Sequence, residues 1–232
     1  MLKLTTPIAV LALSLVFAGC SSTDPNSNSN QQEKVQNWTS SSLLNKSIDL
    51  SVIKKWGYFG SANTSEIDVR SFLEPARDTS RDLIGTRPSE CEPIGALFAN
   101  DPKTGADYVL LQKESNQIVL ASKTMIYTLY AYSDPKKAML QYEKIKEVAN
   151  NCGAITQIRS SQASISDNWE TIELGQDNVL RAVHSDYPMA DAIGLSGSAI
   201  FLLVFIADNL TNAKADRDEA ISLVLKSLST VE

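Results

Sequence analysis

Nucleophilic and acid–base chemistry in this sequence would depend on very few side chains. His184 is the single histidine, and Ser185 and Asp186 follow it directly. A Ser-His-Asp system needs three separated groups that converge in space, and neighbouring positions do not supply that arrangement by themselves. We therefore interpret His184 as a surface residue at the end of a strand. The alternative is a hydrolase in which His184, Ser196 and an aspartate meet in a cleft.

Ser196 lies in a segment that approaches the nucleophile elbow of hydrolases. The segment, residues 194–198, reads GLSGS and lacks the final glycine of that motif. An elbow runs from a strand through a sharp turn into a helix, whereas this segment leads into the apolar run from Ala199 to Ala207. It predicts a hairpin turn, and we assign no catalytic residue.

Metal, cofactor and nucleic-acid chemistry have little support in the composition. A zinc site needs three or four histidine, cysteine or carboxylate ligands, and the chain has one histidine and three cysteines. No aspartate-rich loop fits a calcium site. With a formal net charge of −6, the chain also lacks the clustered cations of a nucleic-acid-binding surface. We expect no metal, no cofactor and no nucleic acid.

Arginines offer the best sequence signal for a ligand. The guanidinium is a planar fork that matches carboxylate or phosphate groups, so an anionic ligand at the edge of a cleft would suit it. The stretch 66–92 is rich in arginine but also holds seven acidic residues, and such mixed charge is typical of a solvated loop or helix face. The stretch is therefore either a site or a solvated surface. The candidate ligand-binding residues are Arg70, Arg77, Arg81, Arg181 and His184.

The N-terminal residues form a secretory signal. A lysine at position 3 precedes an apolar run from Ile8 to Ala18, which is shorter than the roughly 20 residues that span a bilayer. The segment Phe17-Ala18-Gly19-Cys20 resembles the bacterial lipobox, in which the cysteine is lipidated and becomes the mature N-terminus. We expect residues 1–19 to be a signal peptide and Cys20 to carry lipid. The alternatives are an ordinary secreted protein and an uncleaved anchor.

Residues 20–42 are predicted to form a polar, disordered tether, because they offer few apolar side chains to bury. Trp38 marks the end of this tether, either by docking on the domain or by chance exposure. The remaining residues, 43–232, are long enough for one domain with a sizeable core.

The two remaining cysteines, Cys91 and Cys152, are expected to pair because an exported chain lies in an oxidising compartment. The alternative is two buried free thiols. Asp134-Pro135 opens the clearest helix, with an N-cap acid before a proline at the first helical position. Its apolar positions place Cys152 at the end of the buried face. A short helix is predicted just after Cys91, so the disulfide would join two helices.

Strands are predicted between and after the cysteines. Residues 107–113 and 117–132 have strand-like patterns, with a turn at Ser115-Asn116. Three shorter runs follow at 154–159, 168–174 and 179–184, and Gly175 to Asn178 marks a hairpin. The apolar run from Ala199 to Ala207 is the innermost strand, and a terminal helix follows it. Antiparallel strands with helices collected beside them predict an α+β fold with a central antiparallel sheet.

An aromatic cluster precedes these elements. Trp56, Tyr58 and Phe59 lie close to two glycines. They could line a pocket, but the core packing of a first strand is the more frequent cause of such a cluster.

The order of these features resembles the extracellular sensor domain of the PknH-type kinases of actinobacteria, a module that also occurs alone in exported lipoproteins. The resemblance covers about residues 43–232. It rests on Cys91 before a short helix, the run 127–132 before the helix 134–149, Asn151-Cys152-Gly153 after it, Arg181-Ala182 in the next hairpin and the strand 199–207. It implies a central antiparallel sheet, a Cys91–Cys152 bridge, a polar cleft on one side and a sensing or binding role.

The sequence therefore predicts a lipid-anchored, monomeric protein on the extracytoplasmic face of the cell membrane. Its domain would be a non-catalytic sensor or ligand-binding module for a small ligand or an envelope protein. The alternatives are an envelope hydrolase that uses His184 and a protein–protein adaptor. An exposed apolar patch in place of a pocket would favour the adaptor.

Overall fold

A computed structural model describes residues 37–58, 63–73, 83–118, 121–159, 165–184 and 187–229. The predicted signal peptide, Cys20, most of the predicted tether, Arg77 and Arg81 lie outside these residues. Within the described ranges, none of the helices is both long and apolar enough to cross a membrane.

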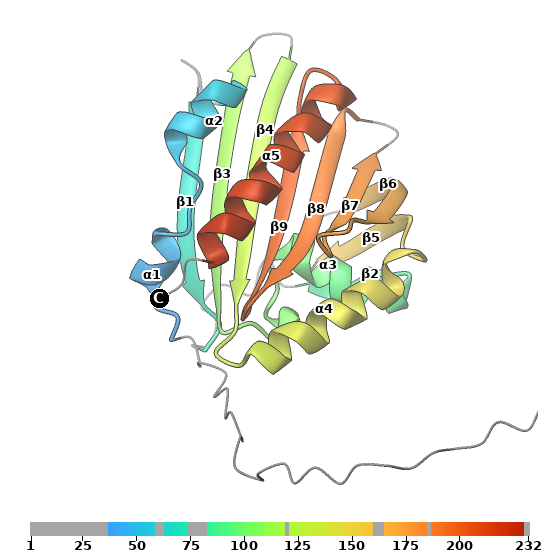
Figure 1. Cartoon of the computed structure of the whole chain (residues 1–232). Coiled ribbons are helices and arrows are strands. Elements are labelled where there is room, and N and C mark those ends of the chain that lie inside the picture. Colours follow the sequence, from blue (N-terminus) through green and yellow to red (C-terminus); the bar gives the residue numbers. More distant parts are fainter. Residues whose placement is uncertain are drawn as a thin grey trace, which may run out of the picture. The chain divides into compact units, whose positions relative to one another are not determined.

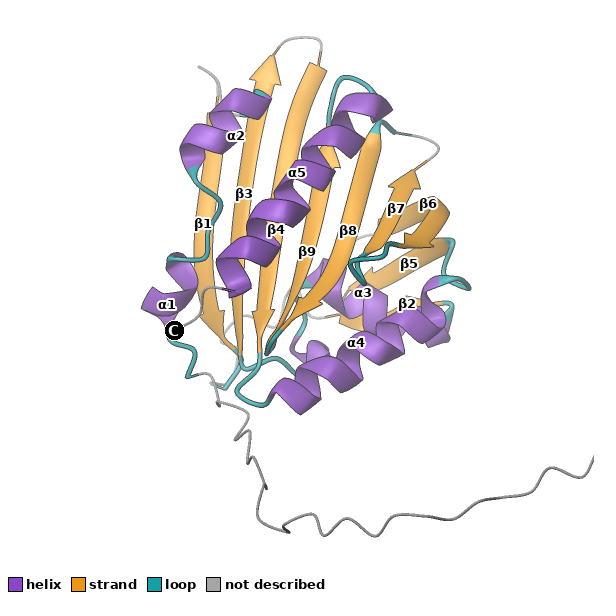
Figure 2. Ribbon diagram, viewed as in Figure 1, coloured by secondary structure: helices purple, strands orange, loops and turns teal. Residues whose placement is uncertain are grey.

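The strands form one sheet with the order β1-β3-β4-β9-β8-β7-β6-β5-β2, and every neighbouring pair is antiparallel. This arrangement confirms the predicted antiparallel sheet (Figure 2). The bounds are β1 Asn63–Ser71, β2 Leu83–Arg87, β3 Tyr108–Ile118, β4 Ala121–Ala131, β5 Ala154–Arg159, β6 Ile165–Leu174, β7 Leu180–His184, β8 Met189–Ser196 and β9 Ala199–Ile206.

Strand β6 joins two parts of this sheet. Its first residues, 165–168, pair with β5, whereas residues 169–174 pair with β7 across a register irregularity. Seven strands from β1 to β6 therefore form the main sheet, and β5 and β2 extend it beyond β6. Irregular pairing of this kind bends a strand and increases its twist.

Helices cover both faces of the sheet. Helix α5 (Leu210–Ser229) crosses one face in front of β4, β9 and β8, with α1 (Ser40–Leu44) and α2 (Leu50–Trp56) beside it over the β1 side (Figure 1). Helices α3 (Glu92–Ala99) and α4 (Pro135–Ala149) pack on the opposite face. Each face thus has its own apolar core, and we call them the α5 face and the α3 face.

The α3 face is held together by buried tyrosines. Tyr130 of β4 donates a hydrogen bond to the carbonyl of Leu97 in α3, and Tyr132 donates to the carbonyl of Thr104 at 3.0 Å. Helix α3 also contacts β2 and β5. Burial raises the pKa of the Tyr130 hydroxyl well above its usual value, so it remains a neutral donor. The far end of the sheet is therefore attached to its centre through α3.

Several predicted elements are confirmed. Helix α4 begins at Pro135 with Asp134 as its N-cap, and β9 lies near the middle of the sheet between β4 and β8. The hairpin at residues 175–178 joins β6 to β7, with Asn178 in the left-handed region at φ 58°. The turn at Gly197 joins β8 to β9, as the GLSGS segment predicted.

Three predictions about the first half of the domain are wrong. The stretch around Trp56 is the helix α2 and not a first strand, because Asp49 caps its N-terminus and Gly57 ends it at φ 81°. Part of the charged stretch 66–92 is the strand β1, and not a loop or a helix as its mixed charge predicted. Ser115 and Asn116 form no turn but lie within β3. They are buried there because their side chains find polar partners.

Trp38 docks on the domain, which decides between the two alternatives for this residue. Only 6% of Trp38 is exposed, and its Nε1 donates a hydrogen bond of 3.0 Å to the Ser198 hydroxyl. A hydrogen bond of this kind contributes about 1 kcal/mol net to stability. The end of the tether is therefore attached to the turn between β8 and β9.

We expect Trp38→Phe to lower the free energy of unfolding by about 1 kcal/mol, because it keeps most of the apolar burial and removes the donor. Urea unfolding of this variant, of Ser198→Ala and of the double variant measures the pair directly. The second substitution should add little once the first is made. Fully additive effects would contradict the hydrogen bond.

Candidate functional site

The described members of the candidate ligand-binding set do not converge. Arg70 lies on the edge strand β1, whereas Arg181 and His184 lie on β7. Five strand spacings, about 24 Å along the sheet, separate β1 from β7 in the strand order. Arg181 and His184 are three residues apart on one strand, so their side chains point to opposite faces of the sheet.

Arg70 interacts with its own strand. Its Nε lies 2.5 Å from Oδ2 of Asp68, and both side chains are at least one-third exposed. Exposed ion pairs contribute little to stability. The solvated-surface alternative therefore describes Arg70, while Arg77 and Arg81 remain outside the described residues.

Arg181 lines an open hollow at the β6–β7 hairpin. The hollow has a volume of about 420 Å³. Asp177 binds the guanidinium through both carboxylate oxygens, at 2.8 Å and 2.6 Å, and Asp218 of α5 lies 3.4 Å from its Nε. The lining residues are Glu173, Leu174, Gly175, Gln176, Asp177 and Arg181.

The contacts of Arg181 leave it little capacity for a ligand. Its Nη1 also donates to the carbonyl of Val179 at 3.1 Å, so four of its five N–H donors are engaged. The bidentate hydrogen bonds from Arg181 lower the pKa of Asp177. Gly175 packs against this pair, and a Cβ at that position would overlap the guanidinium. An anion would have to displace Asp177 to bind this guanidinium. The Arg181–Asp177 pair therefore stabilises the β6–β7 hairpin and leaves no open anion site in the hollow.

We expect Asp177→Asn to lower the free energy of unfolding by up to about 1 kcal/mol at pH 7, because the pair is partly exposed. The folded-state pKa of Asp177 is depressed. Its contribution is therefore present above the unfolded pKa of about 3.9 and is lost as the pH falls through the lower, folded value. The difference between variant and wild type in urea unfolding should shrink below about pH 4. A pH-independent difference would contradict the ion pair.

His184 is buried and paired with an aspartate that sequence reasoning missed. Its Nε2 lies 2.7 Å from Oδ2 of Asp191, and the two side chains are 2% and 1% exposed. The interpretation of His184 as a surface residue is wrong, because the side chain points to the α3 face beside Ala182. One signal could have found the partner: Asp191 is the single acidic residue in the otherwise apolar β8.

The hydrolase constellation proposed for His184 and Ser196 is not formed. Ala190 of β8 lies opposite Val183, the neighbour of His184, whereas Ser196 lies six residues further along β8. Six residues of extended strand span about 20 Å. His184 on β7 therefore lies beside one end of β8 and Ser196 lies at the other end, so the two side chains cannot exchange a proton.

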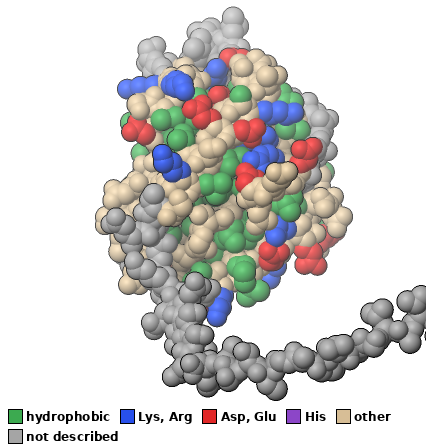
Figure 3. Space-filling model, in the orientation of Figure 1, with side chains coloured by type: hydrophobic (Ala, Val, Ile, Leu, Met, Phe, Trp, Pro, Cys, Tyr) green, Lys and Arg blue, Asp and Glu red, His purple; other side chains and the backbone are tan. Residues whose placement is uncertain are grey.

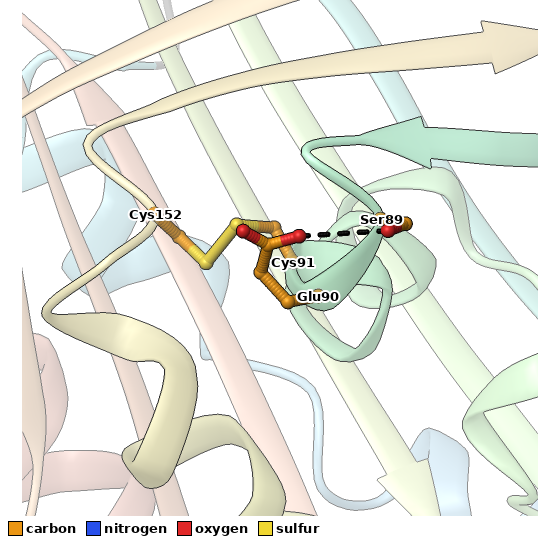
Figure 4. The surroundings of a disulfide bond; sticks show 4 residues. All are labelled: Ser89, Glu90, Cys91 and Cys152. Atoms are coloured by element: carbon orange, nitrogen blue, oxygen red, sulfur yellow. Dashed lines mark hydrogen bonds between the residues drawn. A yellow bond between two sulfur atoms is a disulfide. The ribbon is translucent and has the colours of Figure 1, made fainter.

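Cys91 and Cys152 form the predicted disulfide (Figure 4). Cys91 ends the short 3₁₀ turn η2 (Ser89–Cys91) just before α3, and Cys152 lies between α4 and β5. Both residues are fully buried. The bridge connects segments next to the two helices, and neither cysteine lies within α3 or α4.

No cluster of three or more histidine, cysteine, aspartate or glutamate side chains in the described part of the chain could hold a metal ion.

Comparison with known proteins identifies a solved structure of similar fold. No family model matches the chain, and no curated protein matches it by sequence. Among solved structures, the chain is similar to the extracellular domain of PknH from Mycobacterium tuberculosis, with a TM-score of 0.60 and 10% sequence identity. The match covers 85% of this chain and 100% of that domain. The protein therefore shares the fold of that extracellular domain.

Proposed function

We propose that the protein is a lipid-anchored envelope lipoprotein whose domain senses or binds a ligand outside the cytoplasm without catalysis. The observation that carries this proposal is the fold shared with the extracellular domain of PknH over 85% of the chain. The predicted signal peptide, residues 1–19, which is followed directly by Cys20, supports the anchor.

In this proposal the ligand is not bound by His184 or Arg181, because both side chains already have partners within the domain. His184 is buried against Asp191 and lies about 20 Å from Ser196 along the strand. Arg181 is bound by two carboxylates. These polar groups stabilise the fold, and a ligand would have to be recognised by other surfaces.

The anchor and the binding role are tested separately. For the anchor, Cys20→Ser should move the protein from the membrane fraction to the soluble fraction of the cell, because the thiol receives the lipid. A Cys20→Ser protein that stays in the membrane fraction would refute lipid anchoring at this residue. Cell fractionation with immunoblotting measures the distribution.

For the binding role, native mass spectrometry of the mature protein released from detergent is compared with the mass of the denatured chain. A retained ligand appears as extra mass that is lost on denaturation, and its mass narrows the ligand class. A bare protein, together with no partner trapped by crosslinking in intact cells, would refute the binding module.

A protein–protein adaptor remains the second candidate because α4 exposes apolar side chains. Met139 and Leu140 are 49% and 59% exposed on the outer side of this helix. Figure 3 shows apolar side chains gathered along the middle of the displayed face among charged ones. Crosslinking in intact cells distinguishes this candidate, because Leu140→Lys should abolish capture of an adaptor partner and leave a bound small ligand unchanged.

A further inference from the structure

Helix α2 is attached to β3 at both of its ends by amide side chains. Gln112 accepts from the backbone N–H of Ile48 at 2.8 Å and donates to its carbonyl at 3.0 Å, just before the helix. At the other end, Asn116 donates to the carbonyl of Gly57 at 3.1 Å. Gln112 and Asn116 are four residues apart in one strand, so both point to the α5 face.

Glu114 lies between these two amides and points to the same face. It is 0% exposed. Its Oε1 accepts a hydrogen bond of 2.8 Å from the Ser65 hydroxyl of β1, whereas Oε2 has no hydrogen-bond partner. A carboxylate taken out of water at this depth is costly unless an opposite charge or several donors compensate it.

Two more buried polar atoms on the same face of the sheet have no hydrogen-bond partner. Because Nδ2 of Asn116 is directed to the Gly57 carbonyl, its Oδ1 is the remaining acceptor, and it has no partner. The hydroxyl of Tyr127, opposite Gln112 on β4, also has none. Asn116 is 7% exposed and Tyr127 is 0% exposed. Burial raises the pKa of Tyr127, so its oxygen is a neutral hydroxyl.

Glu114 has no partner of opposite charge in the part of the chain that the structure describes. Among the described residues, no ion pair includes this carboxylate. Lys123 lies opposite Asn116 on β4, but its ammonium is 2.9 Å from Asp208. One carboxylate, with a neutral amide oxygen two residues further along the same face of β3, matches a hard cation with a single positive charge, since calcium sites normally combine several carboxylates.

We propose that Glu114 and Asn116 bind a small monovalent cation such as Na⁺ beneath α2. The carboxylate Oε2 supplies the charge, and Oδ1 of Asn116 supplies a second, neutral oxygen. The Ser65 hydroxyl holds the carboxylate in place. By binding between the two ends of α2, the cation stabilises the attachment of this helix to the sheet.

The test is the thermal unfolding of the mature full-length protein in detergent, in 150 mM NaCl and in 150 mM choline chloride. Ionic strength is constant, so general screening is the same in both salts. For a dissociation constant of about 10 mM, Na⁺ should lower the unfolding equilibrium constant by roughly 16-fold. The melting temperature should rise by several degrees in NaCl.

Glu114→Gln should remove this Na⁺ dependence, because the amide keeps the shape and loses the charge. Glu66→Gln is the matched control on the exposed face of β1, and it should keep the dependence. Equal melting temperatures of the wild type in the two salts would overturn the proposal. In that case a water molecule and not a cation satisfies Glu114. This readout is independent of the ligand or partner of the domain.

Discussion

The Cys91→Ala/Cys152→Ala variant should lose about 4 kcal/mol of unfolding free energy. The disulfide closes a loop with a sequence separation of 61 residues, and in the chain-entropy model a loop of this length restricts the unfolded chain by about that amount. For a domain of this size the melting temperature should fall by roughly 12 °C. Urea unfolding and calorimetry of both proteins measure the loss.

The third cysteine supplies the control for this experiment. Cys20→Ala removes a thiol that takes no part in the bridge, so the unfolding of its domain should match the wild type. The addition of a reductant to the denatured wild type should reproduce the loss, because the bridge then no longer restricts the unfolded chain. A variant as stable as the wild type would show that the bridge adds nothing to the fold.

The elements that the sequence predicted are those with local signals. Asp134 and Pro135 mark the start of α4 within two residues, and the glycine and asparagine of residues 175–178 mark their hairpin. An uninterrupted apolar run identified β9 as a central strand, because only a strand covered on both faces tolerates such a run. These signals need no knowledge of distant residues.

The missed elements depend on partners that are far away in the sequence. Asparagine is typical of a turn, yet the side-chain amide of Asn116 donates a hydrogen bond to the carbonyl of Gly57, which lies 59 residues earlier in the sequence. Strand β1 carries charged residues at every second position, so these side chains share one side of the strand. Water solvates them at the edge of the sheet, but the same sequence pattern is also typical of a solvated loop. The side chain of Trp56 also has a distant partner, since Glu219 of α5 accepts its indole N–H at 2.8 Å. Its helix α2 is an exception, because the caps Asp49 and Gly57 are local signals.

The candidate site was predicted from residue types, and its described members do not lie together. Arg181 and His184, which were grouped as candidate ligand-binding residues, both lie on β7, but their side chains point to opposite faces. The bond between Arg181 and Asp177 spans four residues of one hairpin and could have been foreseen. The bond from Arg181 to Asp218 spans 37 residues and needs the position of α5.

The buried pair on the α3 face should be the most sensitive polar contact in the described domain. Asp191→Leu should cost about 3 kcal/mol of unfolding free energy, because it removes the carboxylate that binds the fully buried imidazole of His184. His184→Phe alone should cost a similar amount, because it leaves the Asp191 carboxylate buried without that ring nitrogen.

The double variant His184→Phe/Asp191→Leu should cost less than the sum of the single substitutions, with a coupling energy of about 2 kcal/mol, because apolar side chains of similar volume replace a buried pair with little loss. The exposed pair of Asp68 and Arg70 is the matched control, and Asp68→Ala should change stability by less than 1 kcal/mol. Urea unfolding of all variants measures these differences.

Additive losses at His184 and Asp191 would mean that each side chain is stabilised by its own surroundings and that the 2.7 Å contact contributes nothing. A large coupling identifies the single histidine of the chain as a structural residue, which also accounts for its burial far from Ser196.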